Sequence, residues 1–184
     1  MSRFTFTKLS LDGLILIERK KVSDQRGFLS RLFCSEELRP IGWSEGIAQI
    51  NHTLTIKKGT VRGVHFQRQP HSEKKLVSCV KGEVWDVAVD IRKDSPTFLK
   101  WHAERLSQDN CKALLIPEGF AHGFQTLSDN CELLYLHSVS YAPDFEDGIR
   151  FNDPILNINW PFPITDYSSR DISHELINKG FKGV

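Results

Sequence analysis

The 184-residue sequence carries almost no net charge and has few cysteines. Its formal net charge at pH 7 is +1, so no overall field would recruit nucleic acid or an anionic membrane. The four cysteines form no CxxC pair, and Cys79 and Cys131 lie in apolar runs, where buried, reduced thiols are expected. The N-terminal stretch MSRFTFTKLS lacks a long apolar run, which predicts neither a signal peptide nor a membrane span and favours a cytoplasmic protein.

Helical periodicity is also scarce, and the sequence has no internal repeat or linker. Short helices are expected over residues 35–40 and 168–177. Most of the remainder is typical of short strands broken by Gly, Pro, Asn and Asp. The clearest strands are expected at residues 14–20, 74–80, 83–91, 112–117, 123–128 and 132–141. This spacing predicts a single all-β domain over residues 1–184, a cupin-type jelly roll wide enough inside to hold a ligand.

Two of these strands are predicted to form a hairpin. They flank Lys81-Gly82, a turn signal between two apolar runs. In the second strand, alternation would place two groups of side chains on opposite faces. One group is Val84, Asp86, Ala88 and Asp90, and the other is Trp85, Val87 and Val89.

Several expected strands carry polar side chains where a core would favour apolar ones. They are Gln49, Asn51, Arg62, His65, Lys75, His122 and Tyr135. Arg62 and His65 would face opposite sides of a regular strand, but Gly63 permits a bulge that turns both to one face. Burying such groups without partners costs about 2–7 kcal/mol each. The set therefore predicts a polar pocket inside the barrel.

The predicted pocket could hold a metal ion, or it could catalyse acid–base chemistry without a metal. Metal-binding cupins often use a His-x-His pair, whereas His65 is followed by Phe66 and Gln67, and the later His71 and Glu73 lie in an expected loop. A His base, a Tyr acid, a cation for an oxyanion and a carboxylate that orients the His would remove a proton beside a carbonyl and return one. The pattern favours this second chemistry.

Longer motifs identify a family. The segments DQRGFLSRLF, QINHT, VRGVHFQ, KLVSCVKGEVWDVAVDIRKDSPTF, LLIPEGFAHGF, ELLY, YAPDFEDGIRFNDP and INWP follow one another over residues 10–172. In order and spacing they resemble the dTDP-4-dehydrorhamnose 3,5-epimerase family, cupin-fold enzymes of dTDP-L-rhamnose synthesis. The resemblance implies an isomerase that acts on a nucleotide-linked 4-keto-6-deoxyhexose and makes an L-sugar for surface polysaccharide or a glycoside.

The resemblance also implies a role for individual residues. His65 would be the general base, Asp171 the carboxylate that orients it, Tyr135 the opposite acid and Lys75 the stabiliser of the enolate. Tyr141 would stack on the nucleotide base, and His122 would be a neighbouring pocket residue. The remaining substrate ligands would be Arg26, Arg62 and Arg170 at the diphosphate or nucleoside, with Gln49, Asn51 and Glu146 completing the pocket.

The family works without a metal or an organic cofactor and forms homodimers. Their N-terminal strands are exchanged, and residues of the partner complete the nucleotide site. Arg26 lies in the region of the sequence from which such a residue would come. The resemblance thus implies a homodimer, whereas the low net charge and the lack of a long apolar run predict neither nucleic acid nor membrane as a partner.

Three positions depart from the family pattern. Arg31 stands where a Glu is usual, Ile50 where an Asp is usual, and Leu136 where a Lys is common. These changes are expected to affect the nucleotide end and the pocket wall more than the catalytic set. They leave the natural nucleotide and sugar open.

Three alternatives accompany the 3,5-epimerase hypothesis. A single-centre epimerase or a 3,4-ketoisomerase could use the same residues. A metal-dependent cupin, for example an oxygenase, could use His65, His71 and His122. A non-catalytic cupin could bind a nucleotide sugar without exchanging its protons.

Overall fold

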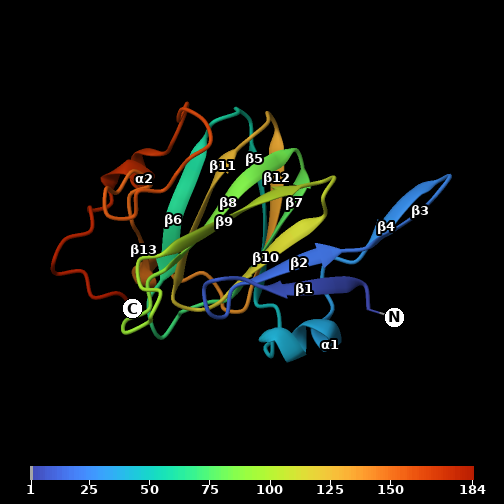
Figure 1. The fold of residues 1–184 in the computed structure, drawn as a ribbon, viewed down its shortest axis with the longest axis horizontal. Helices are drawn as coiled ribbons and strands as arrows, with labels where there is room; N and C mark the ends of the chain where they lie inside the picture. The colour runs from blue at the N-terminus through green and yellow to red at the C-terminus, as the bar shows by residue number, and fades with distance from the viewer. Residues whose placement is uncertain (1) are drawn as a thin grey trace.

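The computed structural model describes residues 2–184, whose strands form two sheets packed face to face (Figure 1). A six-stranded sheet, here the large sheet, has the order β1-β2-β10-β7-β12-β5, and a five-stranded sheet, the small sheet, has the order β13-β6-β11-β8-β9. The large sheet contains β1 (Phe4–Lys8), β2 (Ile15–Arg19), β5 (Gln49–Thr55), β7 (Lys75–Lys81), β10 (Lys112–Ile116) and β12 (Cys131–His137). The small sheet contains β6 (Val61–Gln67), β8 (Glu83–Asp90), β9 (Trp101–Ser107), β11 (Phe120–Thr126) and β13 (Glu146–Gly148).

The other elements are short. A hairpin of β3 (Lys21–Asp24) and β4 (Gly27–Ser30) extends away from the sandwich (Figure 1). The helical turns are α1 (Ser35–Leu38), η1 (Arg39–Ile41), η2 (Pro143–Phe145) and α2 (Ser169–Ser173). The all-β jelly-roll prediction is therefore confirmed, as are short helices in the two expected regions, although α2 is shorter than residues 168–177 suggested. Within residues 2–184, no helix has the length and apolar character needed to cross a membrane.

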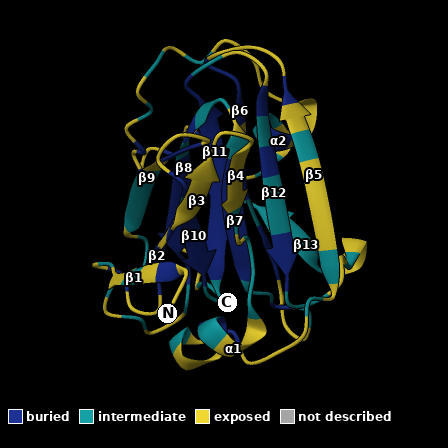
Figure 2. Ribbon diagram, turned by 90° about the vertical axis from the view of Figure 1, so that its right-hand side faces the viewer, coloured by how far each residue is buried: buried dark blue, intermediate teal, exposed yellow. Residues whose placement is uncertain are grey.

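Strand alternation creates three apolar layers. Val77, Leu114 and Leu133 of the large sheet meet Val84 and Ala88 of the small sheet in the central layer. The outer face of the large sheet packs on residues around α1, including Leu38 and Trp43. The outer face of the small sheet packs on the chain after residue 149, including Ile149, Leu156 and Ile158. Figure 2 shows the contrast between these buried strands and the exposed β3, β4 and β5.

The predicted hairpin at Lys81-Gly82 is wrong. β7 pairs with β10 and β12, whereas β8 pairs with β9 and β11, so the chain passes from one sheet to the other at this turn. Gly82 has a φ of +74°, and a Cβ there would lie 2.7 Å from the Ser128 Oγ, which explains the glycine. The predicted alternation in β8 is nevertheless correct, because Val84 and Ala88 face the central layer and Val87 and Val89 face the outer one.

The predicted bulge in β6 is confirmed. His65 is paired with His122 and Arg62 with Phe124, so β6 has one more residue than β11 between the two pairs. Gly63, at a φ of +114°, lies against Gly123, and a Cβ on Gly63 would be 2.6 Å from the Gly123 Cα. The extra residue turns both Arg62 and His65 toward the same cavity.

Replacing Gly63 by alanine tests this close contact between backbones. Gly63→Ala should lower the free energy of unfolding by about 2–3 kcal/mol, because the positive φ and the contact with Gly123 both oppose a Cβ. Urea denaturation followed by circular dichroism would measure it. Gly46→Ala is the control, since a Cβ there meets no atom within 4 Å. Equal stability of the two variants would contradict the proposed constraint.

Candidate active site

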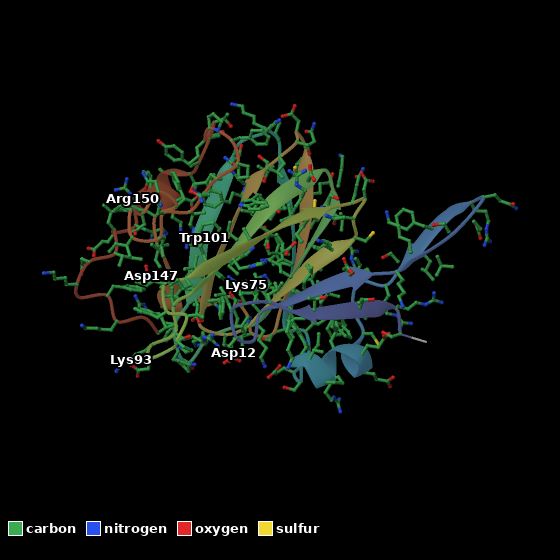
Figure 3. The ribbon with its side chains drawn as sticks, viewed as in Figure 1. Asp12, Lys75, Lys93, Trp101, Asp147 and Arg150 are labelled. Carbon is green, nitrogen blue, oxygen red and sulfur yellow. The ribbon has the colours of Figure 1, made fainter. Side chains whose placement is uncertain are left out.

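A cavity of about 560 Å³ opens between the two sheets. Its walls come from β5, β7 and β12 of the large sheet, from β6 and β11 of the small sheet, and from the segment that leads into α2. Lys75, one of its lining residues, lies near the middle of the molecule in Figure 3. The central apolar layer ends where this polar cavity begins, because Tyr135 packs against that layer and also lines the cavity.

The structure brings together almost all the residues predicted for the site. The predicted residues that line the cavity are Gln49, Asn51, Arg62, His65, Lys75, His122, Tyr135, Tyr141, Glu146, Arg170 and Asp171. Arg26 does not line it: this side chain lies at the tip of the β3–β4 hairpin, is 84% exposed and pairs with Asp24 at 2.6 Å. Sequence reasoning therefore located a single cavity with one predicted ligand outside it.

His65 and Asp171 form the first ionisable pair. The His65 Nε2 lies 2.7 Å from the Asp171 Oδ1, and α2 places the carboxylate there because Ser168 caps its N-terminus, accepting a hydrogen bond from the Asp171 backbone N–H. Burial alone would raise the pKa of Asp171, but hydrogen bonds and the nearby imidazole hold that pKa below its ordinary value. The ionised carboxylate therefore favours a proton on Nε2 and leaves the lone pair of His65 on Nδ1.

Tyr135 lies across the cavity on β12. Burial raises the pKa of this phenol well above its ordinary value, and the carboxylate of Asp86 raises it further, so Tyr135 keeps its proton at neutral pH. His122 contacts the phenol edge to face, with ring centroids 5.9 Å apart. His122 is itself held by Asp86, whose Oδ1 lies 2.8 Å from the His122 Nε2.

The base candidate and the acid candidate belong to opposite sheets. His65 comes from β6 of the small sheet, whereas Tyr135 and Lys75 come from β12 and β7 of the large sheet. A molecule bound between the sheets would present one face to an imidazole and the other to a phenol. That arrangement can remove a proton from one face of a carbon and deliver one to the other.

The mouth of the cavity carries forked cations and an exposed aromatic ring. Arg62 and Arg170 are exposed there, and Arg170 pairs with Glu146 at 2.5 Å. Burial alone would raise the pKa of Glu146, but Tyr141 and Arg170 hold it below its usual range. Guanidinium groups suit phosphate oxygens, and the half-exposed ring of Tyr141 suits a flat base.

The sequence did not reveal the buried ionisable residues Glu73, His137 and Asp86 as part of the site or its support. Glu73 was considered only for a metal and His137 was not considered, yet both line the cavity. Asp86 was assigned to a strand face but not to the site, although it holds His122. The alternation of β12 could have found His137, because it lies two residues beyond Tyr135 and therefore on the same face.

Comparison with known proteins agrees with this geometry. Residues 8–179 match the family model described as dTDP-4-dehydrorhamnose 3,5-epimerase. The chain belongs to the dTDP-4-dehydrorhamnose 3,5-epimerase family. The curated family member from Salmonella typhimurium is 41% identical over 174 residues, which cover 94% of each chain.

Solved structures show the same relationship. A Legionella pneumophila 3,5-epimerase in complex with dTDP-4-keto-L-rhamnose has a TM-score of 0.89 at 38% identity, covering 94% of this chain and 92% of that one. A 3'-monoepimerase from Streptomyces bikiniensis in complex with dTDP-quinovose has a TM-score of 0.84 at 32% identity, covering 91% of this chain and 85% of that one. The fold is thus shared by epimerases that differ in the centres they invert.

The three departures from the epimerase family pattern lie outside the cavity. Ile50 is 60% exposed on the outer face of β5, and Leu136 is buried in the layer beneath α1. Arg31 follows β4 and pairs with Glu37 at 2.5 Å. None of the three residues therefore lines the cavity of this chain, and their expected effect on the nucleotide end and the pocket wall stays a prediction.

The residues of the metal alternative do not converge. His65 and His122 line the cavity, but His71 does not and packs on Phe145, with ring centroids 4.4 Å apart. Within residues 2–184, no three His, Cys, Asp or Glu side chains are grouped as metal ligands would be.

Cys79, Cys111 and Cys131 are buried and free, as predicted for Cys79 and Cys131.

The hydrogen bond between His65 and Asp171 should contribute to stability in a pH-dependent way. Because the folded-state pKa of Asp171 lies below the ordinary value of 3.8, its contribution is present above pH 3.8 and is lost as the pH falls through the folded-state value. Asp171→Asn should reduce the free energy of unfolding by about 1–3 kcal/mol at pH 7. This difference should narrow below pH 3.8.

Urea denaturation of both proteins from pH 7 to pH 3 would test this dependence. Asp144→Asn is the control, since Asp144 is exposed and lies outside the cavity. If the difference in unfolding free energy between wild type and Asp171→Asn stayed constant with pH, Asp171 would not be stabilised as a carboxylate.

Proposed function

We propose that this protein inverts C3 and C5 of dTDP-4-dehydro-6-deoxy-D-glucose and thereby forms dTDP-4-dehydro-L-rhamnose. The main observation behind this proposal is that one cavity contains a base candidate and an acid candidate on opposite sheets. The base candidate is His65, oriented by Asp171, and the acid candidate is the protonated phenol of Tyr135. Membership of the epimerase family and the dTDP-sugar complex of the Legionella relative support the choice of substrate.

The proposed chemistry follows from the base on one wall of the cavity and the acid and cation on the other. The His65 Nδ1 takes the proton from the carbon beside the ketone. The electron pair of that C–H bond forms a carbon–carbon double bond to the ketone carbon, and the π pair of the ketone moves onto its oxygen. The resulting imidazolium is stabilised by Asp171, and the enolate oxygen by the ammonium of Lys75. Tyr135 then donates its proton to the other face of the carbon, and the ketone re-forms. Before the second round, His65 releases its proton to solvent and Tyr135 regains one from solvent. The same steps at the second carbon adjacent to the ketone then complete the double inversion.

The nucleotide would occupy the mouth of the cavity. Tyr141 supplies the ring for the base, and Arg62 and Arg170 supply donors for the diphosphate. Gln49 and Asn51 line the wall nearby, where amides can bind sugar hydroxyls. The sugar would thereby be held deeper in the cavity, between His65 and Lys75.

The working unit in this proposal is a homodimer with exchanged N-terminal segments. The β3–β4 hairpin exposes Val22, Phe28 and Leu29, and the edge strand β5 with its following residue exposes Ile50, Leu54 and Ile56. Apolar surface of this kind is typical of an interface. Arg26, at the tip of the hairpin, would enter the cavity of the partner and bind its diphosphate.

Inversion at a single centre is the second candidate. The likeness to the Streptomyces bikiniensis 3'-monoepimerase favours it, because a similar scaffold supports inversion at one carbon there. The two candidates share the base, the acid and the nucleotide site. They differ in how many carbons beside the ketone lose their protons.

Proton NMR in D2O distinguishes the two candidates. With wild-type enzyme and dTDP-4-dehydro-6-deoxy-D-glucose, the H3 and H5 signals of the sugar should both disappear as deuterium enters and the L-configured product forms. Loss of only one signal would establish the single-centre reaction. Retention of both signals would refute epimerisation of this substrate.

Two variants assign the roles in the same assay. His65→Asn should slow deuterium entry by about 10²–10⁴-fold. Tyr135→Phe should lose inversion yet retain deuterium entry, because His65 can return a deuteron to the face from which it took the proton. His102→Asn, on β9 away from the cavity, is the control. Inversion by Tyr135→Phe at the wild-type rate would refute the role of the phenol.

Complementation between subunits tests Arg26. Arg26→Ala and His65→Asn homodimers should each be nearly inactive, since each site lacks one essential group. After equal mixing and subunit exchange, half the dimers are mixed and each has one intact site, so about a quarter of wild-type activity should return. Absence of recovery, with mixed dimers confirmed by mass spectrometry, would contradict a site shared between subunits.

A further inference from the structure

The cavity contains a histidine–carboxylate pair that the proposed reaction does not use. His137 of β12 lies two residues beyond Tyr135, and its Nδ1 is 2.6 Å from the Glu73 Oε2. The other oxygen of Glu73 lies 3.2 Å from the Lys75 Nζ. Glu73 and His137 are both largely buried, with side-chain exposures of 8% and 11%. The pair therefore connects the Tyr135 side of the cavity to the cation proposed to stabilise the enolate.

A directed chain of hydrogen bonds reaches this pair from the backbone. The Tyr141 N–H donates to the Gln49 Oε1 at 3.0 Å, which fixes the orientation of that amide. The Gln49 Nε2 must then be its donor, and it donates to the Asn51 Oδ1 at 2.9 Å. This in turn directs the Asn51 Nδ2 toward the His137 Nε2, 3.4 Å away.

The chain determines the tautomer of His137. Because the Asn51 Nδ2 carries only donors, the His137 Nε2 must be an acceptor without a proton. The remaining proton lies on Nδ1, where it is donated to Glu73. Burial alone would raise the pKa of Glu73, but the His137 hydrogen bond and the Lys75 charge hold it below its ordinary value, so Glu73 is an acceptor. The contacts at both ends of the ring are thus satisfied by the tautomer with its proton on Nδ1.

We propose that His137 is a positioning residue that occupies one oxygen of Glu73 and thereby holds Lys75 in place with donors free for the substrate oxyanion. This inference rests on the proposed role of Lys75 in the epimerisation. With one carboxylate oxygen taken by His137, only the other faces the ammonium. An ammonium carries three donors, so Lys75 is anchored by Glu73 without being fully engaged.

The same chain links the two ends of the substrate site. It begins at the backbone of Tyr141, the residue proposed to stack on the nucleotide base, and ends at Lys75, which would contact the ketone oxygen. The amides of Gln49 and Asn51 lie between them and line the cavity. Their donors and acceptors are therefore oriented before the substrate arrives, which lowers the cost of ordering them on binding.

Two isosteric variants separate the two ring nitrogens of His137. In His137→Asn the shorter amide can place its nitrogen near the former Nδ1 and still donate to Glu73. In His137→Gln the longer amide can place its oxygen near the former Nε2 and accept from Asn51, but the donor to Glu73 is lost. The inference predicts that His137→Asn keeps kcat within about threefold of wild type and that His137→Gln lowers it about tenfold.

The pattern of rates distinguishes positioning from mere packing. A structural role would be disturbed similarly by both variants, with parallel losses of kcat. Parallel losses, or a lower kcat for His137→Asn than for His137→Gln, would overturn the inference. Urea denaturation of both variants would show whether each remains folded under the assay conditions.

The tautomer can be measured without any activity. Nitrogen-15 NMR of histidine-labelled protein, assigned with His137→Asn, should show a protonated Nδ1 and a bare Nε2 at neutral pH. The opposite tautomer, or a doubly protonated ring, would overturn the inference even in an active enzyme. Wild-type protein that failed to epimerise the dTDP sugar would instead refute the proposed function, and the tautomer result would still decide the hydrogen-bond chain.

Discussion

The arrangement of the cavity depends on the free-energy cost of burying charged groups between two β-sheets. An unpaired ionised group in such a place would shift its pKa and become neutral. Here the ionisable side chains are held in pairs: His65 with Asp171, His122 with Asp86, and Lys75 with Glu73. Pairing keeps the carboxylates of Asp171 and Glu73 ionised. It also gives each partner an orientation, so the same contacts that make burial tolerable prepare the site for proton transfer.

The paired side chains must also face the same cavity, and the geometry of the backbone provides this. Arg62 and His65 share a face only because β6 contains an extra residue, and that residue is accommodated where Gly63 meets Gly123. The bulge therefore converts a strand that would direct its two polar side chains to opposite sides into one wall of the cavity. In the partner wall, β12 pairs with β7 in regular register from Leu133 to His137, so Tyr135 and His137 reach the cavity by ordinary alternation.

Local sequence patterns predicted the strands better than their pairing. Alternation in residues 83–91 identified the correct faces, since side-chain direction depends only on neighbouring residues. The turn at Lys81-Gly82 was assigned to a hairpin because the same glycine signal serves a tight turn and a passage between sheets. Only the distant partners β10 and β12 decide between them, and their register is not encoded within the turn.

The site, like the strands, was predicted where local sequence sufficed and missed where contacts between distant strands decide. Family motifs identified the residues that would touch a substrate, and the cavity contains all of them except Arg26. The supporting residues Asp86, Glu73 and His137 were missed because their importance depends on contacts across strands. Arg26 lies outside the cavity of its own chain, and its proposed role depends on a second chain, which residue spacing within one chain cannot locate.

The two-sheet architecture also explains how a proton transfer that separates charge can occur in a confined space. In the proposed reaction, removal of a carbon-bound proton would create a cation on His65 and an anion on the ketone oxygen. The cation would form beside Asp171, at the small sheet, and the anion beside Lys75, at the large sheet. Each new charge thus arises next to a fixed charge of opposite sign. Because Asp171 and Lys75 are already held by their partners, little of the protein would need to reorganise. Re-protonation by Tyr135, the proposed acid, would then discharge the anion from the same sheet that stabilised it.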